Sequence, residues 1–319
     1  MSRFLLLLIA TLITSGVQAQ AFPSRPIRVI VPFPAGGVSD ILSRSVAQKM
    51  GESLGQNVIV ENRPGAGGMV GSAAVAKSPA DGYTLVNGST STVVVSAHLY
   101  KSLSFDPIKD FEPVGRIASV ASVLIAHPSV PVNSVRELIA LTKAQPGRLN
   151  YGSGGAGTTQ HLGGELFKQM AGVDIVHVPY KGGAPALTDL VGGQLSVIFE
   201  PLPTALPNLR AGKVKALAVT TARRIAALPD TPTLVEAGLP GYEMAIWFGL
   251  LAPAGTPREI VSRINAELVK AMRTPEVRER LANQAADPIG DTPEEFAATL
   301  RQESQRWGEF ARATGLKLD

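Results

Sequence analysis

The chain has 319 residues, which is enough length for two domains of ordinary size. Hydrophobic residues make up 45% of the chain and charged residues 18%, and this balance excludes a disordered protein. The formal net charge of +4 is small and no basic run occurs, so nucleic acid is excluded as an expected partner. The chain contains no cysteine, which excludes disulfides, thiol chemistry and a cysteine-linked lipid anchor.

The first 19 residues have the pattern of a secretory signal peptide. Arg3 precedes an apolar stretch over residues 4–13, and Val17-Gln18-Ala19 supplies a small-x-small cleavage pattern. The apolar stretch is too short for a permanent membrane helix, and no later stretch is long and apolar enough for insertion. We therefore expect cleavage after Ala19 and a mature protein that is free in the periplasm.

Residues 27–44 form the first unit with a functional signature. A β-branched stretch predicts a buried strand, the turn after it carries Gly36 and Gly37, and a helix is expected from Ser39 and Asp40. Adjacent glycines let the backbone approach a ligand closely. The first amides of a helix have no partner within the helix, and the helix dipole favours an anion there. This unit predicts one half of an anion-binding cleft.

A second unit of the same kind lies at residues 149–170, where a strand, a glycine-rich turn and a helix follow one another. Elsewhere strands and helices alternate, which is typical of an α/β fold with largely parallel sheets. The other predicted strands are residues 57–60, 83–86, 119–126, 173–178, 195–199, 215–219 and, as the last strand, 246–251. Three helices should follow, with capping boxes at 256–259 and 292–295 and a start at Thr274.

These elements predict two lobes with a cleft between them. The first lobe is expected to comprise residues 20–120 and 246–319, and the second residues 121–245, with two chain crossings as the hinge. Hydroxyl residues follow the strand at 83–86, at the end of a strand where ligands of open α/β sheets usually bind. Each lobe should therefore offer polar groups to the cleft.

Motifs of catalysis and metal binding are missing from the sequence. Ser153 has Tyr151 and Gly155 where a nucleophile elbow requires glycine at both positions. The phosphate-binding loop and the dinucleotide fingerprint are absent. His161 and Glu165 lie one helical turn apart, but no third metal ligand is evident, which favours ordinary helix packing. We predict no catalytic site, no metal and no cofactor.

Polar residues of the glycine-rich loops favour binding instead. Asp40 could pair with Arg44 four residues on, or contact a ligand directly. The loop hydroxyls could cap turns or contact a ligand, and they belong to Ser89, Thr90, Ser91, Ser153, Thr158 and Thr159. Because neither main loop contains arginine or lysine, a carboxylate would depend on amides, hydroxyls and helix dipoles. Lys181 is the nearest candidate cation, or else part of a solvated turn.

Seven segments occur in a specific order: PFPAGGVSDILSR from Pro32, VENRPGAGG from Val60, SPADGYTL from Ser78, LNYGSGGAGTTQHLGGELF from Leu149, HVPYKGGAPALTDL from His177, LPDTPTLVEAGLPGYE from Leu228 and APAGTP from Ala252. With them the chain closely resembles the extracytoplasmic solute receptors of tripartite tricarboxylate transporters, often called Bug-type receptors. The resemblance runs over nearly the whole mature chain.

The resemblance implies a type II periplasmic binding protein fold. In this fold two Rossmann-like α/β lobes, joined by two crossover strands, close on an organic acid in the cleft. It also implies a monomeric receptor that delivers the acid to the membrane subunits of a tripartite tricarboxylate-type transporter. The ligand-binding residues that it implies are Phe33, Pro34, Ala35, Gly36, Gly37, Ser39, Asp40, Ser89, Thr90, Ser153, Gly154, Gly157, Thr158, His161 and Glu200.

Glu200 departs from the family pattern, which usually has aspartate after the strand at 195–199. The longer side chain could push a carboxylate further into the pocket and change which ligand fits, or it could only cap the following helix. The resemblance leaves the ligand open among tri- and dicarboxylates, amino acids and aromatic acids. Two other functions also stay open, a periplasmic sensor that docks with a signalling receptor and an enzyme on the same fold.

Overall fold

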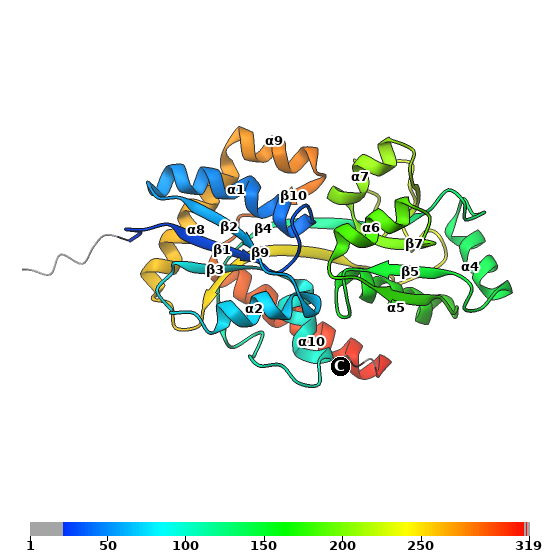
Figure 1. The fold of residues 1–319 in the computed structure, drawn as a ribbon, viewed down its shortest axis with the longest axis horizontal. Helices are drawn as coiled ribbons and strands as arrows, with labels where there is room; N and C mark the ends of the chain where they lie inside the picture. The colour runs from blue at the N-terminus through cyan, green and yellow to red at the C-terminus, as the bar shows by residue number, and fades with distance from the viewer. Residues whose placement is uncertain (1–21, 316, 318–319) are drawn as a thin grey trace, which may run out of the picture.

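The computed structural model describes residues 22–315 and 317, so the predicted signal peptide at 1–19 lies outside the described residues. Figure 1 shows two lobes side by side, with the strands of each lobe between helices. The strands follow one another in the order β2-β1-β3-β9-β4-β7-β5-β6, and β4 also pairs with β8 and β10. The predicted two-lobed α/β fold is confirmed.

The sheet of the first lobe is mixed, so the prediction of a largely parallel sheet is wrong for this lobe. Its parallel part is formed by three strands near the N-terminus. These strands are β1 (Ile27–Val31), β2 (Val58–Asn62) and β3 (Thr84–Ser89). β1 pairs in parallel with both neighbours. Because successive side chains of a strand point to opposite faces, Ile27 and Val29 join one buried core and Ile30 joins another. Both faces of this sheet are therefore covered, as the apolar sequence of β1 predicts.

Helices cover the two faces of the first-lobe sheet. They are α1 (Val38–Leu54), α2 (Met69–Ala76), α8 (Arg258–Arg273), α9 (Pro275–Asn283) and α10 (Pro293–Thr314). The apolar residues of α1, α8 and α9 share one core, whereas those of α2 and α10 belong to the other. Three short segments complete the lobe: a 3₁₀ turn (Ala66–Gly68), a π-helical turn (Thr90–Val95) and α3 (Ser96–Leu99).

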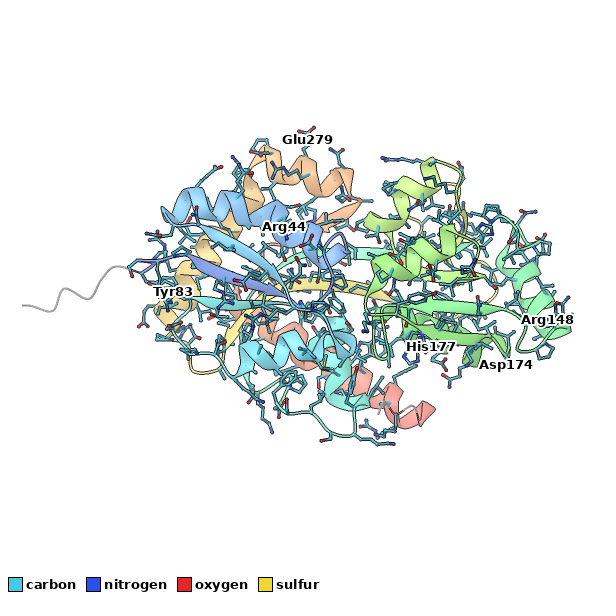
Figure 2. All side chains as sticks on the ribbon, viewed as in Figure 1. Arg44, Tyr83, Arg148, Asp174, His177 and Glu279 are labelled. Carbon is cyan, nitrogen blue, oxygen red and sulfur yellow. The ribbon has the colours of Figure 1, made fainter. Side chains whose placement is uncertain are left out.

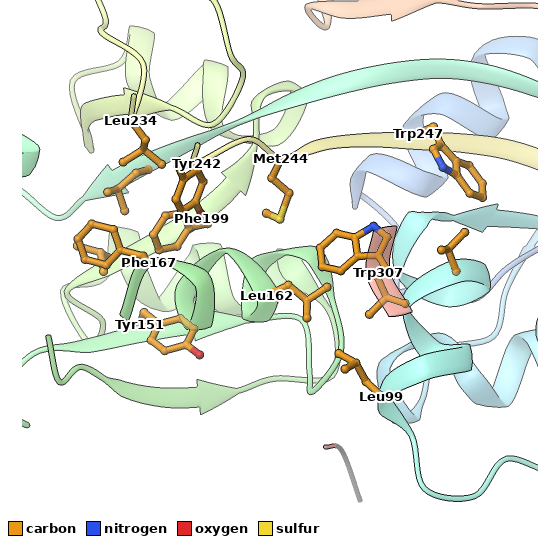
Figure 3. Close-up of a cluster of buried hydrophobic side chains, with 14 of the residues drawn as sticks. Leu99, Tyr151, Leu162, Phe167, Phe199, Leu234, Tyr242, Met244, Trp247 and Trp307 are labelled. Carbon is orange, nitrogen blue, oxygen red and sulfur yellow. The ribbon is translucent and has the colours of Figure 1, made fainter. Parts of the chain in front are cut away.

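The second lobe repeats this arrangement with shorter elements. Its strands and helices are β5 (Asn150–Ser153), β6 (Val176–Pro179), β7 (Val197–Pro201), β8 (Lys215–Val219), α4 (Val135–Ala144), α5 (Thr159–Ala171), α6 (Gly183–Val191) and α7 (Leu202–Arg210). Figure 3 shows the aromatic side chains of this lobe's core, where the ring of Phe199 lies 5.7 Å from that of Phe167 and 6.3 Å from that of Tyr242. The Tyr242 hydroxyl donates to the Gly163 carbonyl at 2.9 Å, which satisfies a buried polar group.

Two long strands connect the lobes, β4 (Phe111–Ala126) and β9 (Ala245–Pro253). Up to Ala121, β4 pairs with β9, and from Ser122 onward it pairs with β7 and β8 of the second lobe. The change of partner falls at the predicted first crossing. We therefore propose that the lobes divide at 120/121 and 245/246, as the sequence predicts.

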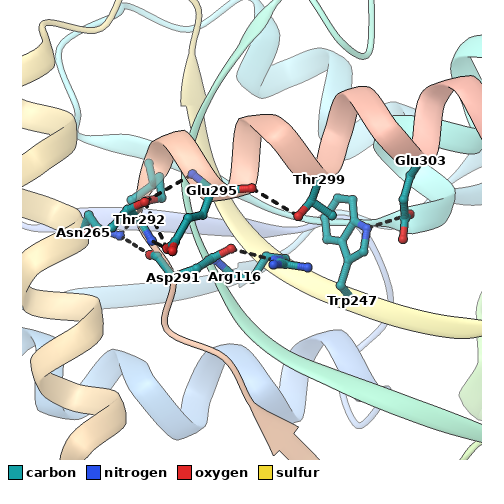
Figure 4. A network of polar contacts seen from close by, with 9 residues as sticks. Arg116, Trp247, Asn265, Asp291, Thr292, Glu295, Thr299 and Glu303 are labelled. Carbon is teal, nitrogen blue, oxygen red and sulfur yellow. Dashed lines mark hydrogen bonds and ion pairs between the residues drawn. The ribbon is translucent and has the colours of Figure 1, made fainter.

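Polar contacts of α10 fix both connecting strands to the first lobe (Figure 4). Arg116 of β4 donates from Nε to Oδ2 of Asp291 at 2.8 Å, just before the helix begins. Trp247 of β9 donates from Nε1 to Oε2 of Glu303 at 2.9 Å. Thr292 and Glu295 form the predicted capping box at the start of α10. The C-terminal helix therefore holds the first-lobe ends of both connections.

Three local predictions are resolved by the structure. Thr274 caps α9 as predicted. The capping box predicted at 256–259 is wrong: Pro257 is the N-cap of α8, and the Thr256 hydroxyl donates instead to the Pro253 carbonyl at 2.7 Å. The prediction that 246–251 is the last strand is also wrong, because β10 (Ala286–Pro288) follows and pairs antiparallel with β4.

Candidate functional site

A cavity of about 50 Å³ lies between the lobes. A cavity of this volume has room for roughly three to five waters. Its walls come from Phe33, Gly37, Val38, Ser39, Ser89, Ser91, Ile246 and Phe248 on one side and Gly154, Thr158, Thr159, Gln160, Gly183, Ala184, Glu200 and Pro201 on the other. The site is therefore shared by the two lobes and suits a small molecule.

Four helices begin at this cavity: α1, α5, α6 and α7. Their N-cap residues are Gly37, Thr158, Gly182 and Pro201, and none of them forms a side-chain cap. Among the helices whose N-caps do not line the cavity, α4, α9 and α10 are capped by serine or threonine side chains, whereas α2, α3 and α8 form no side-chain cap. The first amides of an uncapped helix are free to donate, and its dipole favours an anion. The cavity thus lies at four positive helix ends.

On the first-lobe side, the end of β3 supplies hydroxyl groups. Ser89 and Ser91 both line the cavity, and their hydroxyls lie 2.9 Å apart. Ser89 also caps the π-helical turn together with Thr92. The Thr90 hydroxyl instead accepts a hydrogen bond from the Trp247 amide at 3.2 Å, and Thr90 does not line the cavity. This short stretch therefore serves both the cavity and the connection to β9.

Asp40 braces the first glycine loop from behind the cavity. Its carboxylate accepts hydrogen bonds from the Gly36 amide at 3.0 Å, Arg44 Nε at 2.9 Å and Asn62 Nδ2 at 3.0 Å. Burial alone would raise the pKa of Asp40, but hydrogen bonds from Arg44, Gly36 and Asn62 outweigh it and hold the pKa below its usual value. Of the two interpretations of Asp40, the structure shows the pairing with Arg44, which Figure 2 labels on the first lobe.

Glu200 forms the opposite wall, within β7, and only 1% of its surface is exposed. Gln160 Nε2 donates to its Oε2 at 2.5 Å, and the Thr204 hydroxyl donates to Oε1. The Gly154 amide donates to Gln160 Oε1 at 2.6 Å, which orients the Gln160 amide group. Burial raises the pKa of Glu200 to about 7, although both side-chain hydrogen bonds act to lower it.

The contacts of Glu200 also bear on the idea that it caps α7. Among the described residues, its oxygens accept hydrogen bonds from two side chains and not from the first backbone amides of the helix. The structure therefore favours the interpretation in which its carboxyl group faces the pocket.

A pair of stacked histidines supports the second-lobe loop from beneath. The rings of His161 and His177 lie 4.2 Å apart, and Figure 2 labels His177 on this lobe. His161 Nδ1 accepts from the Gly157 amide at 3.1 Å, and His177 Nε2 lies 2.6 Å from the Ser153 hydroxyl. Burial lowers the pKa of both rings, that of His177 to about 4. Neutral rings therefore hold the loop, and the described residues include no group of three potential metal ligands.

Loops of the two lobes touch at the rim of the cleft. A Cβ atom on Gly182 would lie 2.4 Å from Cδ of Pro34, so only glycine allows this approach. The Tyr100 hydroxyl donates to the Ala156 carbonyl at 2.9 Å. Lys181 lines a second cavity of about 170 Å³ at this rim and is not among the residues lining the first.

The structure brings part of the predicted site to the cavity wall. Seven predicted residues line it: Phe33, Gly37, Ser39, Ser89, Gly154, Thr158 and Glu200. The others lie behind the wall or at the rim, and they are Pro34, Ala35, Gly36, Asp40, Thr90, Ser153, Gly157 and His161. The lining residues absent from the predicted set are Val38, Ser91, Thr159, Gln160, Gly183, Ala184, Pro201, Ile246 and Phe248. Ser91 and Thr159 are hydroxyl residues of the same loops as the predicted ones, so the sequence pattern could have identified them. Nothing in the sequence marks the apolar residues of β9 as part of the site.

Two lobes on crossing strands, with a small cavity between them, define a solute-binding protein. The sequence profile of the tripartite tricarboxylate transporter family receptors matches residues 42–316. The chain therefore belongs to this family of receptors, and the predicted resemblance is confirmed. Within the described part of the chain, no helix combines the length and apolar character that crossing a membrane requires.

Known relatives cover almost the whole chain. BugT of Bordetella pertussis (strain Tohama I) is 39% identical over 307 residues, 96% of this chain and 94% of BugT. The structure of R. palustris Rpa4515 with adipate has a TM-score of 0.89 at 40% identity, covering 93% of this chain and 99% of that protein. MatC from Rhodopseudomonas palustris with bound malate has a TM-score of 0.87 at 35% identity, covering 90% and 99%.

Proposed function

We propose that this receptor captures a small organic carboxylate between its lobes and delivers it to the membrane subunits of a tripartite tricarboxylate-type transporter. The observation that carries the proposal is the meeting of four uncapped helix N-termini at one cavity. Burying a carboxylate is costly unless donors replace its water shell. Backbone amides and the hydroxyls of Ser89, Ser91 and Thr159 can supply such donors.

The ligand class rests on this chemistry and on two relatives. Rpa4515 and MatC, which share the fold along nearly their whole length, are described with adipate and with malate. Glycine-rich walls from both lobes would enclose such an acid when the cleft closes.

The chain is further proposed to act without chemistry, as a monomer in the periplasm. Cleavage after Ala19 would release the mature protein, and N-terminal sequencing of the periplasmic fraction should read Gln20 as the first residue. Binding of ligand-loaded but not ligand-free protein to the membrane subunits would support delivery. Equal binding of both forms would argue against it.

The ligand class can be tested with a thermal-shift screen of mature protein, refolded to remove carried-over ligand. The panel contains tri-, di-, amino and aromatic acids. An acid at about a hundred times its dissociation constant should stabilise the protein by roughly 2.7 kcal/mol. Each 1 kcal/mol raises the melting temperature of a unit of 150–250 residues by about 2–4 °C, so a true ligand gives a clear shift. No shift with any acid would refute the carboxylate proposal.

A further inference from the structure

The cavity contains one ionisable side chain, and that side chain is an acid. Among the sixteen lining residues, Glu200 alone can carry a charge, and no lysine, arginine or histidine belongs to the wall. A cavity whose helix ends attract an anion therefore also contains a carboxyl group of its own. Two carboxylates in one small water-excluded space repel each other, and such pairs raise one pKa strongly.

The hydrogen bonds around Glu200 can accommodate a proton. Thr204 Oγ1 lies within reach of two acceptors, Glu200 Oε1 and the Pro201 carbonyl, the latter at 2.9 Å. A threonine hydroxyl has one proton to donate. When Glu200 is ionised, Thr204 donates to it. When Oε1 carries a proton, Oε1 can donate to Thr204, which then turns its own proton to the Pro201 carbonyl. Both states of Glu200 are satisfied by the same atoms.

The amide of Gln160 is compatible with either state as well. The Gly154 amide fixes Gln160 Oε1 as an acceptor, so Nε2 is the group that faces Glu200 Oε2. A proton on Oε1 leaves this second hydrogen bond in place, because the carbonyl oxygen of a neutral carboxyl group still accepts. Protonation therefore requires no rearrangement of the wall.

Among the residues that the structure describes, no fixed cation holds Glu200 in its charged form. The charged or titratable side chains on the surrounding elements are Asp40, Arg44, Lys49 and Glu52 on α1, Glu112 and Arg116 on β4, Tyr151 on β5, His161, Glu165 and Lys168 on α5, Asp189 on α6 and Arg210 on α7. None of them acts on the Glu200 carboxyl, whose pKa responds only to burial and to its two hydrogen bonds. Burial is the larger cause and raises the pKa to about 7.

We propose that the cavity takes up its carboxylate ligand together with one proton, which is bound by Glu200 Oε1. This inference rests on the proposed carboxylate-binding function and adds that the protonation state of Glu200 controls binding. A ligand anion is bound when Glu200 is neutral, so affinity falls as the pH rises. With a pKa of about 7 in the free protein, affinity should be about 25-fold weaker at pH 8.5 than at pH 6.5.

Isothermal titration calorimetry with adipate and with malate tests this inference on the mature protein. Both acids are fully ionised from pH 6.5 to 8.5, since free carboxyl groups titrate near pH 4. Titrations in two buffers of different ionisation enthalpy give the number of protons taken up. We expect the 25-fold loss of affinity, with uptake that approaches one proton per ligand at pH 8.5.

Glu200→Gln keeps a neutral side chain of similar shape and should remove both the pH dependence and the proton uptake. Glu303→Gln is the matched control, because Glu303 is a half-buried acid with a raised pKa that lies outside the cavity wall. It should retain the wild-type slope. Binding by wild type with constant affinity and no uptake overturns this inference alone, even if Glu200→Gln fails to fold. No heat with any acid of the panel at either pH overturns the proposed function as well.

Discussion

Replacing Gly37 with valine should abolish ligand binding while the fold stays intact. Gly37 lines the cavity with a φ of −78°, a value that any L-residue can adopt. A Cβ atom there would have only the Pro34 carbonyl oxygen within 4 Å, at 3.4 Å, so a side chain would enter open space. Valine adds three carbon atoms, each about the size of a water, to a cavity with room for roughly three to five waters.

This change should affect binding far more than stability. Valine is a poorer N-cap than glycine, which costs about 1 kcal/mol of folding free energy, or about 2–4 °C in melting temperature. Loss of more than half of the cavity should weaken binding at least about a hundredfold, or about 2.7 kcal/mol. Calorimetry with the acid found in the screen measures the affinity, and thermal unfolding measures stability.

Gly37→Ala is the matched control for this experiment. It suffers the same loss of the glycine N-cap but adds only one carbon atom, so its affinity should stay within about tenfold of wild type. Wild-type affinity in Gly37→Val would refute the placement of this loop in the binding site. Equal losses in both variants would show that the helix start, and not the cavity volume, controls binding.

Three further variants test the supporting contacts. Tyr100→Phe removes the hydrogen bond to the Ala156 carbonyl across the cleft and should speed ligand release about 2- to 10-fold in stopped-flow measurements; an unchanged rate would contradict a role in closure. Burial lowers the pKa of His177 to about 4, so the neutral ring's contribution to stability should be present above pH 6.5 and lost as the pH falls to about 4. His177→Gln should therefore flatten the pH dependence of the free energy of unfolding in this range, as measured by urea denaturation. Asp40→Asn should lower the free energy of unfolding by about 1 kcal/mol and weaken binding less than Gly37→Val does, since Asp40 braces the loop without lining the cavity. A larger loss of affinity than in Gly37→Val would indicate direct contact between Asp40 and the ligand.

Features of the structure that depend on nearby residues could be predicted from the sequence. The caps at Thr274 and Thr292 each bond an amide three residues on, and both occur where the sequence places them. Thr256 begins the same pattern but does not cap α8, because the helix begins one residue later, with Pro257 as its N-cap. A local pattern cannot fix the residue at which a helix begins after a strand ends.

Features that depend on distant pairing could not be predicted in this way. β10 has three residues and includes a proline, so no alternation marks it, and its pairing with β4 alone makes it a strand. Ile246 and Phe248 reach the cavity because β9 crosses between the lobes. Gln160 was overlooked because its position beside Glu200 requires that α5 pack against β7. Long-range contacts thus decide which residues of the loops line the cavity.

The lack of a basic side chain in the wall follows from the presence of Glu200. A flexible lysine or arginine in this small cavity would pair with that carboxylate, and a ligand anion would then have to displace an existing ion pair. Helix N-termini present a positive field but cannot move to neutralise the acid, because their amides belong to rigid backbone. The site therefore keeps its attraction for an incoming anion. Protonation of Glu200 then removes the repulsion between its carboxylate and that of the ligand.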